Sequence, residues 1–185
     1  MDLSNLPKDL PVPIDDGACS HLKGMKIPDI ELLSTSDRDV NLSKLSSWVV
    51  IYFYPMTGRP NVALPDGWEQ IPGARGCTPQ SCSFRDHHKE LKLLNAEVFG
   101  VSVQDTEYQL EAKNRLHLPF DLLSDSSYAL SNALRLPTFY IEGFKLIKRT
   151  TIIAKSGIIE KVFYPVFPPD KNADQVIAWL SEQKA

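Results

Sequence analysis

The chain lacks the features that mark membrane, secreted and nucleic-acid-binding proteins. None of its apolar runs approaches the roughly eighteen residues that a membrane-spanning helix needs. It has no block of lysine or arginine, and its formal net charge of −3 does not favour nucleic acid or an acidic membrane surface. Residues 1–17 have neither the basic nor the apolar part of a secretory signal. We therefore expect a cytoplasmic protein that binds neither nucleic acid nor membrane.

Cysteine is also scarce, because only Cys19, Cys77 and Cys82 are present. A small secreted domain held by disulfides would carry more cysteines, in an even number. In a reducing compartment, a close pair such as Cys77 and Cys82 more often indicates redox chemistry or metal binding than a structural disulfide.

The length of 185 residues fits one domain with one substantial core. Residues 1–24 show little periodicity and are expected to form an arm that packs irregularly or stays mobile. In residues 25–185 we expect strands at 28–32, 40–42, 48–54, 98–103, 149–154 and 158–164, and helices at 78–95, 106–116, 128–136 and 173–182. The apolar strand 48–54 is typical of the middle of a sheet covered on both faces. This order predicts an α/β fold with a central mixed sheet flanked by helices.

The stretch from Gly76 to Asp86 places two cysteines at the start of a helix. Thr78 is a suitable cap, and a proline follows it in the first turn. Cys77 then lies where unpaired backbone N–H groups and the helix dipole favour a thiolate. On an intact helix Cys77 and Cys82 point about 140° apart, too far for a disulfide. A bond between them requires the first turns to unwind, which fits a transient catalytic disulfide; two separate thiols, one simply buried, are the alternative.

His87 and His88 follow Cys82 on the same predicted helix, so a zinc site is a further possibility. Structural zinc sites hold a second pair of ligands elsewhere in the chain, and the sequence has no distant pair of that kind. We therefore expect no metal here, and regard a zinc-binding module as the least favoured interpretation.

The sequence FYP at 53–55 and the run GCTPQSCSFRD at 76–86 resemble the active-site block of the peroxiredoxins. The resemblance is closest to the PrxQ branch, also called bacterioferritin comigratory protein, and covers roughly residues 25–185. Further matching blocks lie at 99–102, 122–125 and 149–151 and at Gly157. The resemblance implies a thioredoxin-like fold and a thiol-dependent peroxidase.

By this resemblance Cys77 is the peroxidatic cysteine, which attacks hydrogen peroxide or an organic hydroperoxide and becomes a sulfenic acid. Cys82 is the resolving cysteine, which forms an intramolecular disulfide with it. Thioredoxin or a glutaredoxin-like dithiol would reduce that disulfide, and the cycle needs no metal or organic cofactor. A redox sensor or partner-binding protein on the same fold is the alternative function. Both a monomer and a homodimer are compatible with the sequence.

The family places an arginine from a late strand beside the peroxidatic sulfur, in an R-x-T pattern. Arg149 fits that pattern, and Lys148 is the competing assignment. A fixed guanidinium there would favour the thiolate and donate hydrogen bonds to the peroxide. Gln80, one turn past Cys77, either bonds near the site or is exposed.

The family threonine that lies three residues before the cysteine is replaced here by Ala74. We expect Thr57 to take its place in space, with residues 58–75 bulging out as an insertion. Alternatively, Thr57 only caps a turn and its role is lost or shared with Thr78. The predicted substrate-binding residues are Thr57, Pro55 and Gly76. Cys19 lies outside the resemblance and is a bystander or a regulatory thiol.

Overall fold

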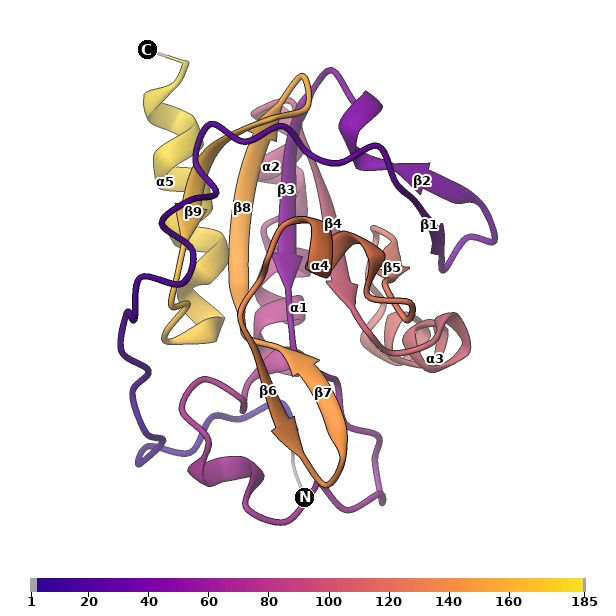
Figure 1. Cartoon of the computed structure of the whole chain (residues 1–185), viewed down its shortest axis with the longest axis vertical. Coiled ribbons are helices and arrows are strands. Elements are labelled where there is room, and N and C mark those ends of the chain that lie inside the picture. Colours follow the sequence, from indigo (N-terminus) through magenta and orange to yellow (C-terminus); the bar gives the residue numbers. More distant parts are fainter. Residues whose placement is uncertain (1–2, 185) are drawn as a thin grey trace.

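Strand β3 (Trp48–Phe53) is an inner strand, between β4 and β8, of a mixed sheet that has seven strands within residues 3–184, the part of the chain that the computed structural model describes. The strand order is β2-β1-β5-β4-β3-β8-β9 (Figure 1). The other strands are β1 (Glu31–Ser34), β2 (Asp39–Asn41), β4 (Ala96–Ser102), β5 (Leu122–Ser124), β8 (Thr150–Lys155) and β9 (Ile158–Phe163). The pairs β3–β4 and β4–β5 are parallel and the other pairs antiparallel. The predicted central mixed sheet is confirmed.

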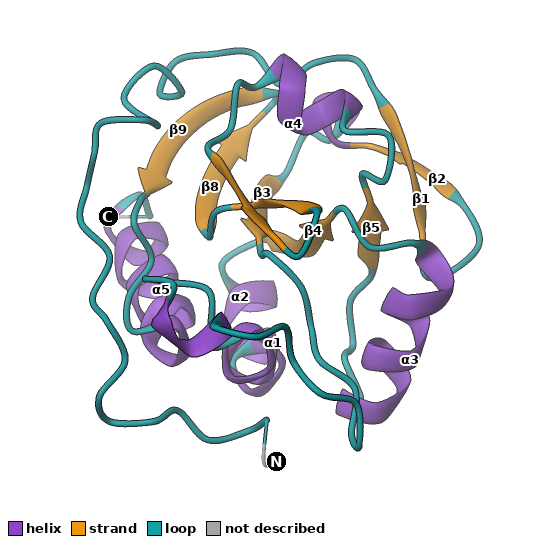
Figure 2. Ribbon diagram, turned by 60° about the horizontal axis from the view of Figure 1, so that its bottom comes forward, coloured by secondary structure: helices purple, strands orange, loops and turns teal. Residues whose placement is uncertain are grey.

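Helices cover both faces of this sheet (Figure 2). One face carries α1 (Cys77–Asp86), α2 (His88–Leu93), α3 (Thr106–Leu116) and α5 (Asn172–Glu182); the other carries the short α4 (Ala129–Ala133). Side chains alternate across a strand, so β3 contributes to two cores. Tyr52 packs with α1 and α5, whereas Ile51 and Phe53 pack on the opposite side. No helix within residues 3–184 is long and apolar enough to cross a bilayer.

The described part of the arm, residues 3–24, runs along the domain without forming a helix or strand. Leu22 and Cys19 are buried in the core beneath α4. Leu3 is buried as well, and its side chain approaches Gly58 in the long loop. The irregular packing expected for the arm is therefore found, while the domain boundary at residue 24 stays a prediction.

The long loop before α1 contains a single short 3-10 helix, Trp68–Gln70, within the described residues. Trp68 is buried, and its ring centroid lies 6.0 Å from that of Phe139. Phe139 belongs to a hairpin of β6 (Thr138–Ile141) and β7 (Phe144–Ile147), which forms its own small sheet. The loop and the hairpin together form a third apolar cluster.

Several elements differ from the predictions. The helix expected at 78–95 is divided at His87 into α1 and α2, because the backbone leaves helical geometry there. The first strand lies at Glu31–Ser34 rather than 28–32, and α4 is shorter than 128–136. Strand β5 and the β6–β7 hairpin were not predicted.

Candidate active site

The entry into α1 depends on Gly76. Its φ of 117° lies in the left-handed region that L side chains rarely adopt, and a Cβ there would be 2.3 Å from Pro169 Cγ. The chain can therefore pass close to the 3-10 helix Pro169–Lys171 and begin α1 with Cys77 as its first residue. The expectation that Thr78 caps this helix is wrong, because Gly76 occupies the cap position and Thr78 is buried in the first turn.

A buried cation lies beside the sulfur at this helix start. Cys77 Sγ is 3.2 Å from Nη2 of Arg149, the residue immediately before β8. The two residues are 4% and 3% exposed. Arg149 also donates to the backbone oxygens of Ala74, at 3.0 Å, and Gly73, at 3.3 Å. The guanidinium thus fixes the end of the long loop and the thiol in one place.

The positive charge of Arg149 is not offset by a carboxylate among its hydrogen-bond partners in the described residues. Within residues 3–184 its hydrogen bonds end on uncharged oxygens and on Cys77 Sγ. A buried cation is unfavourable unless negative charge faces it, and a Cys77 thiolate would supply that charge. The start of α1 favours the same form of the sulfur.

Lys148 lies elsewhere, with its Nζ 3.2 Å from Asp16 Oδ2 and the side chain 40% exposed. Of the two residues considered for the active-site cation, the structure brings Arg149 to Cys77. Its catalytic role stays a prediction, supported by that position.

Arg149 is held by a second group that the sequence left ambiguous. Gln80 is fully buried, and its Oε1 accepts a 2.5 Å hydrogen bond from Arg149 Nη1. Gln80 Nε2 in turn donates to Oδ1 of Asn172, the first residue of α5, at 3.0 Å. No motif pointed to Asn172 or to the loop carbonyls that bind Arg149.

Cys82 lies on α1 as a half-buried free thiol, and Cys77 is free as well. Burial raises the pKa of Cys82. Tyr52 holds the intervening turn on the sheet, since its hydroxyl is 3.0 Å from Ser81 Oγ and its ring stacks on Phe84 at 4.8 Å. A disulfide between the two cysteines would therefore require these contacts to break.

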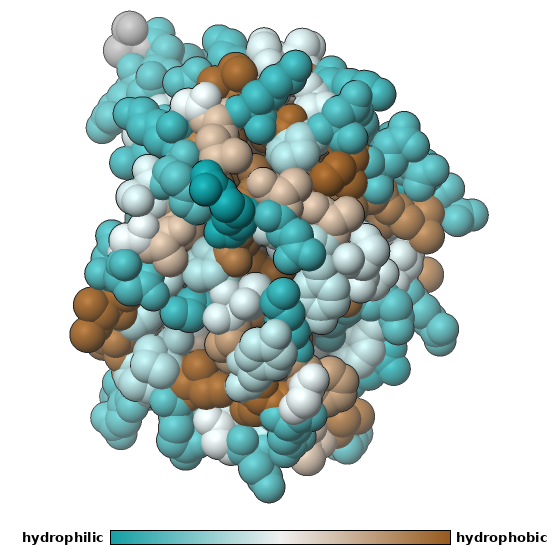
Figure 3. Space-filling view, in the orientation of Figure 1, coloured by the Kyte–Doolittle hydropathy of each residue, from teal (hydrophilic) through white to brown (hydrophobic). Residues whose placement is uncertain are grey.

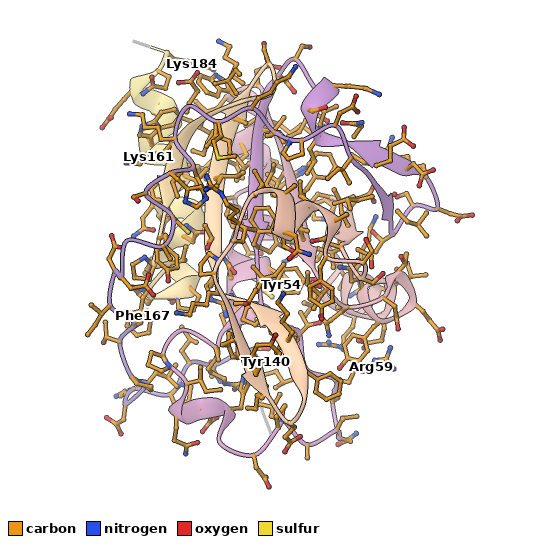
Figure 4. The ribbon with its side chains drawn as sticks, in the orientation of Figure 1. Tyr54, Arg59, Tyr140, Lys161, Phe167 and Lys184 are labelled. Carbon is orange, nitrogen blue, oxygen red and sulfur yellow. The ribbon has the colours of Figure 1, made fainter. Side chains whose placement is uncertain are left out.

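The predicted substrate-binding threonine, Thr57, is hydrogen-bonded to Gln104. Thr57 is buried, and both its backbone N–H and its hydroxyl donate to Oε1 of Gln104, at 3.0 and 3.3 Å. Pro55 is buried just before it, after Tyr54, which lies well inside the molecule (Figure 4). The roles of Thr57, Pro55 and Gly76 in peroxide binding stay predictions.

Cys19 is separated from this site by the sheet. Its Sγ is 3.8 Å from Thr150 Oγ1, and Thr150 points to the face opposite Arg149 and Thr151. Burial raises the pKa of Cys19 to about 11. As for the zinc interpretation, residues 3–184 contain no group of three or more potential ligands that could hold a metal ion.

These environments predict an order of labelling by iodoacetamide in the reduced protein. Cys77 should react first, Cys82 more slowly, and Cys19 last, since at pH 8 only about one Cys19 in a thousand is ionised. Cys19 labelling should rise with pH until about 11. Peptide mass mapping of timed samples measures the order, and urea-unfolded protein, in which the three rates converge, is the control. Equal rates in the folded protein would contradict the assignment.

The comparisons with known proteins agree with this geometry. The family model described as Redoxin matches residues 22–177, and the chain belongs to that family. Peroxiredoxin Q of Sedum lineare is 31% identical over 163 residues, which cover 88% of this chain and 79% of that protein. Within the Redoxin family, the chain is thus a member of the peroxiredoxin Q branch. The predicted family and enzyme class, a thiol-dependent peroxidase, are confirmed.

Other relatives extend the comparison. Peroxiredoxin Q of rice (Oryza sativa subsp. japonica) is also 31% identical, and the match covers 85% of this chain but only 66% of the rice protein. Peroxidoxin BcpB of Mycobacterium tuberculosis superposes with a TM-score of 0.73 at 25% identity, covering 89% of this chain and all of that one. The bacterioferritin comigratory protein of Xanthomonas campestris has a TM-score of 0.69 at 21% identity, with 96% and 100% coverage. The thioredoxin-like fold is confirmed.

Proposed function

We propose that this chain reduces peroxides through Cys77 and Cys82. The Cys77 thiolate attacks the distal oxygen of a hydroperoxide, the O–O bond breaks, and the leaving oxygen takes a proton to give water or an alcohol. Cys77 is then a sulfenic acid. The Cys82 thiol attacks its sulfur, water leaves, and a Cys77–Cys82 disulfide forms.

The observation that carries the proposal is the 3.2 Å contact between Arg149 Nη2 and Cys77 Sγ at the start of α1. The Arg149 guanidinium stabilises the thiolate and offers N–H donors to the oxygens of the peroxide as negative charge develops on the leaving oxygen. Thr57, with Pro55 and Gly76, is proposed to complete the peroxide site.

The proposal includes organic hydroperoxides as well as hydrogen peroxide. A cavity of about 360 Å³ reaches Arg149 from the surface and is lined largely by apolar side chains, among them Phe139, Ile14 and Val166. An alkyl group would fit such a lining. The bacterioferritin comigratory protein of Xanthomonas campestris has alkyl peroxide reduction activity, which supports the same substrate class here. On the face shown in Figure 3, apolar residues form separate patches between hydrophilic ones.

We further propose that thioredoxin or a glutaredoxin-like dithiol reduces the disulfide by exchange, in the cytoplasm. The protein would act as a monomer or homodimer. Residues 25–185 are the proposed catalytic domain, with 1–24 as its arm and 58–75 as an insertion. A redox sensor is the second candidate, because a disulfide that needs α1 to unwind would also serve as a switch.

One equivalent of hydrogen peroxide is expected to remove two thiols per reduced chain and to leave a Cys77–Cys82 disulfide. Thiol titration and peptide mass mapping measure both, and a parallel titration with cumene hydroperoxide tests the organic substrate. With thioredoxin, its reductase and NADPH, turnover should continue for many equivalents. A reaction that ends after one equivalent would favour the sensor, and persistence of all three thiols would exclude both functions.

A further inference from the structure

A chain of buried side chains links the C-terminal helix to the guanidinium beside Cys77. Arg149 Nη1 donates to Gln80 Oε1, and Gln80 Nε2 donates to Asn172 Oδ1. The Thr151 hydroxyl donates to the same Asn172 oxygen at 2.7 Å. Gln80, Thr151 and Asn172 are 0% exposed. Water therefore does not compete for these hydrogen bonds.

The direction of each hydrogen bond in this chain is fixed by chemistry. A guanidinium only donates, so Gln80 must turn its oxygen toward Arg149. The Gln80 amide group then points at Asn172, which must accept with its own oxygen. Rotation of either amide by 180° would set donor against donor. Arg149 thus sets the orientation of the Gln80 amide, and Asn172 holds the other end of that amide as an acceptor.

This arrangement satisfies two buried donors and leaves a third donor without a partner. With its oxygen accepting two hydrogen bonds, the Asn172 amide nitrogen is buried, and the described residues offer it no hydrogen-bond partner. An unsatisfied buried donor destabilises a fold, but an apolar residue of similar size would leave two donors, Gln80 Nε2 and the Thr151 hydroxyl, without their acceptor. The Asn172 oxygen is therefore the part of this side chain that an apolar residue could not replace.

We propose that Asn172 is a positioning residue for the two-step reaction, an inference that rests on the proposed function. Through Gln80 it aims Arg149 at Cys77, and through the same hydrogen bond it ties α5 to the first turn of α1. Gln80 lies between Cys77 and Cys82, so the turn that must unwind before the disulfide forms is the turn that Asn172 holds.

The two steps should therefore respond in opposite directions when the acceptor is removed. In Asn172→Leu, the Gln80 amide nitrogen loses its acceptor, so the Gln80 oxygen that accepts from Arg149 is held less firmly. We expect the reaction of Cys77 with peroxide to slow by about tenfold, and disulfide formation to accelerate by about threefold, in line with the loss of one or two hydrogen bonds. A variant that only weakens the fold has no reason to separate the two steps.

Stopped-flow fluorescence can follow both steps, with peroxide concentration separating the bimolecular reaction from the unimolecular disulfide formation. Val176→Ala is the matched control, because Val176 is a fully buried residue of α5 outside the hydrogen-bonded chain. Its two rates should stay within about twofold of wild type, whereas its melting temperature should fall. If Asn172→Leu behaves like this control, the proposal is wrong.

Two further measurements keep the inference independent of folding and of the proposed function. Asn172→Asp retains an acceptor oxygen for Gln80 and Thr151, so it should form the disulfide at the wild-type rate, and a rate as high as that of Asn172→Leu would contradict the proposal. The rate of Cys77 labelling by iodoacetamide needs no peroxide. It should fall in Asn172→Leu but not in Val176→Ala. Should wild type fail to react with peroxide, this rate still tests the positioning role.

Discussion

Cys77→Ser is expected to reduce the rate of peroxide consumption to background, a loss on the order of 10⁴-fold or more. A serine hydroxyl in the same place is not ionised near neutral pH and cannot form the sulfenic acid. Cys82→Ser should instead react with the first equivalent of peroxide at close to the wild-type rate and then stop as a sulfenic acid. Competition kinetics measure the rate of the first step, and a dimedone adduct on the Cys77 peptide detects the sulfenic acid.

Cys77→Ser and Cys82→Ser together distinguish the peroxidatic cysteine from the resolving one. Cys19→Ser is the control, because Cys19 lies across the sheet and its thiol is held protonated by burial. It should retain wild-type turnover with thioredoxin. If Cys82→Ser turned over as wild type does and Cys19→Ser did not, the resolving cysteine would be misassigned.

The sequence predicted the framework of this site well because the relevant signals are local. The β-branched and aromatic side chains at 48–54 can all be buried only on an inner strand of a sheet, and β3 is such a strand. A hairpin turn between two apolar segments predicted β8 and β9 almost residue for residue. Cys77 at a helix start was predicted from its neighbours in the chain, and only the cap was assigned to the wrong residue.

Of the features that were not predicted, the β6–β7 hairpin is local and the contact of Asn172 is long-range. Glu142 and Gly143 both have positive φ and form the turn of the β6–β7 hairpin, and a glycine between two apolar segments is a sequence signal for such a turn. Asn172 carries no such signal, because an asparagine at a helix start usually caps it. Its contact with Gln80 spans 92 positions, and only the folded chain brings the two together.

The second large effect is expected at Arg149. In Arg149→Met the peroxide reaction should slow by about 10²- to 10³-fold, the range measured when one transition-state donor is removed from an active site. The variant also loses the positive charge that faces the Cys77 sulfur, so labelling of Cys77 by iodoacetamide should slow as well. Arg149→Lys keeps the charge but not the planar fork that binds Gln80, Ala74 and the sulfur together, so we expect an intermediate rate.

Lys148→Met is the matched control, because it removes the neighbouring positive charge, which pairs with Asp16 at 3.2 Å on the surface. Its rate should remain within about twofold of wild type, as expected for an exposed ion pair. Circular dichroism establishes that each variant is folded before the rates are compared. A large loss in Lys148→Met together with a small one in Arg149→Met would transfer the catalytic role to Lys148. Arg149 is also the anchor for the loop carbonyls of Gly73 and Ala74, so its loss should weaken peroxide binding as well. The fall in the iodoacetamide labelling rate should therefore account for only part of the lost rate with peroxide.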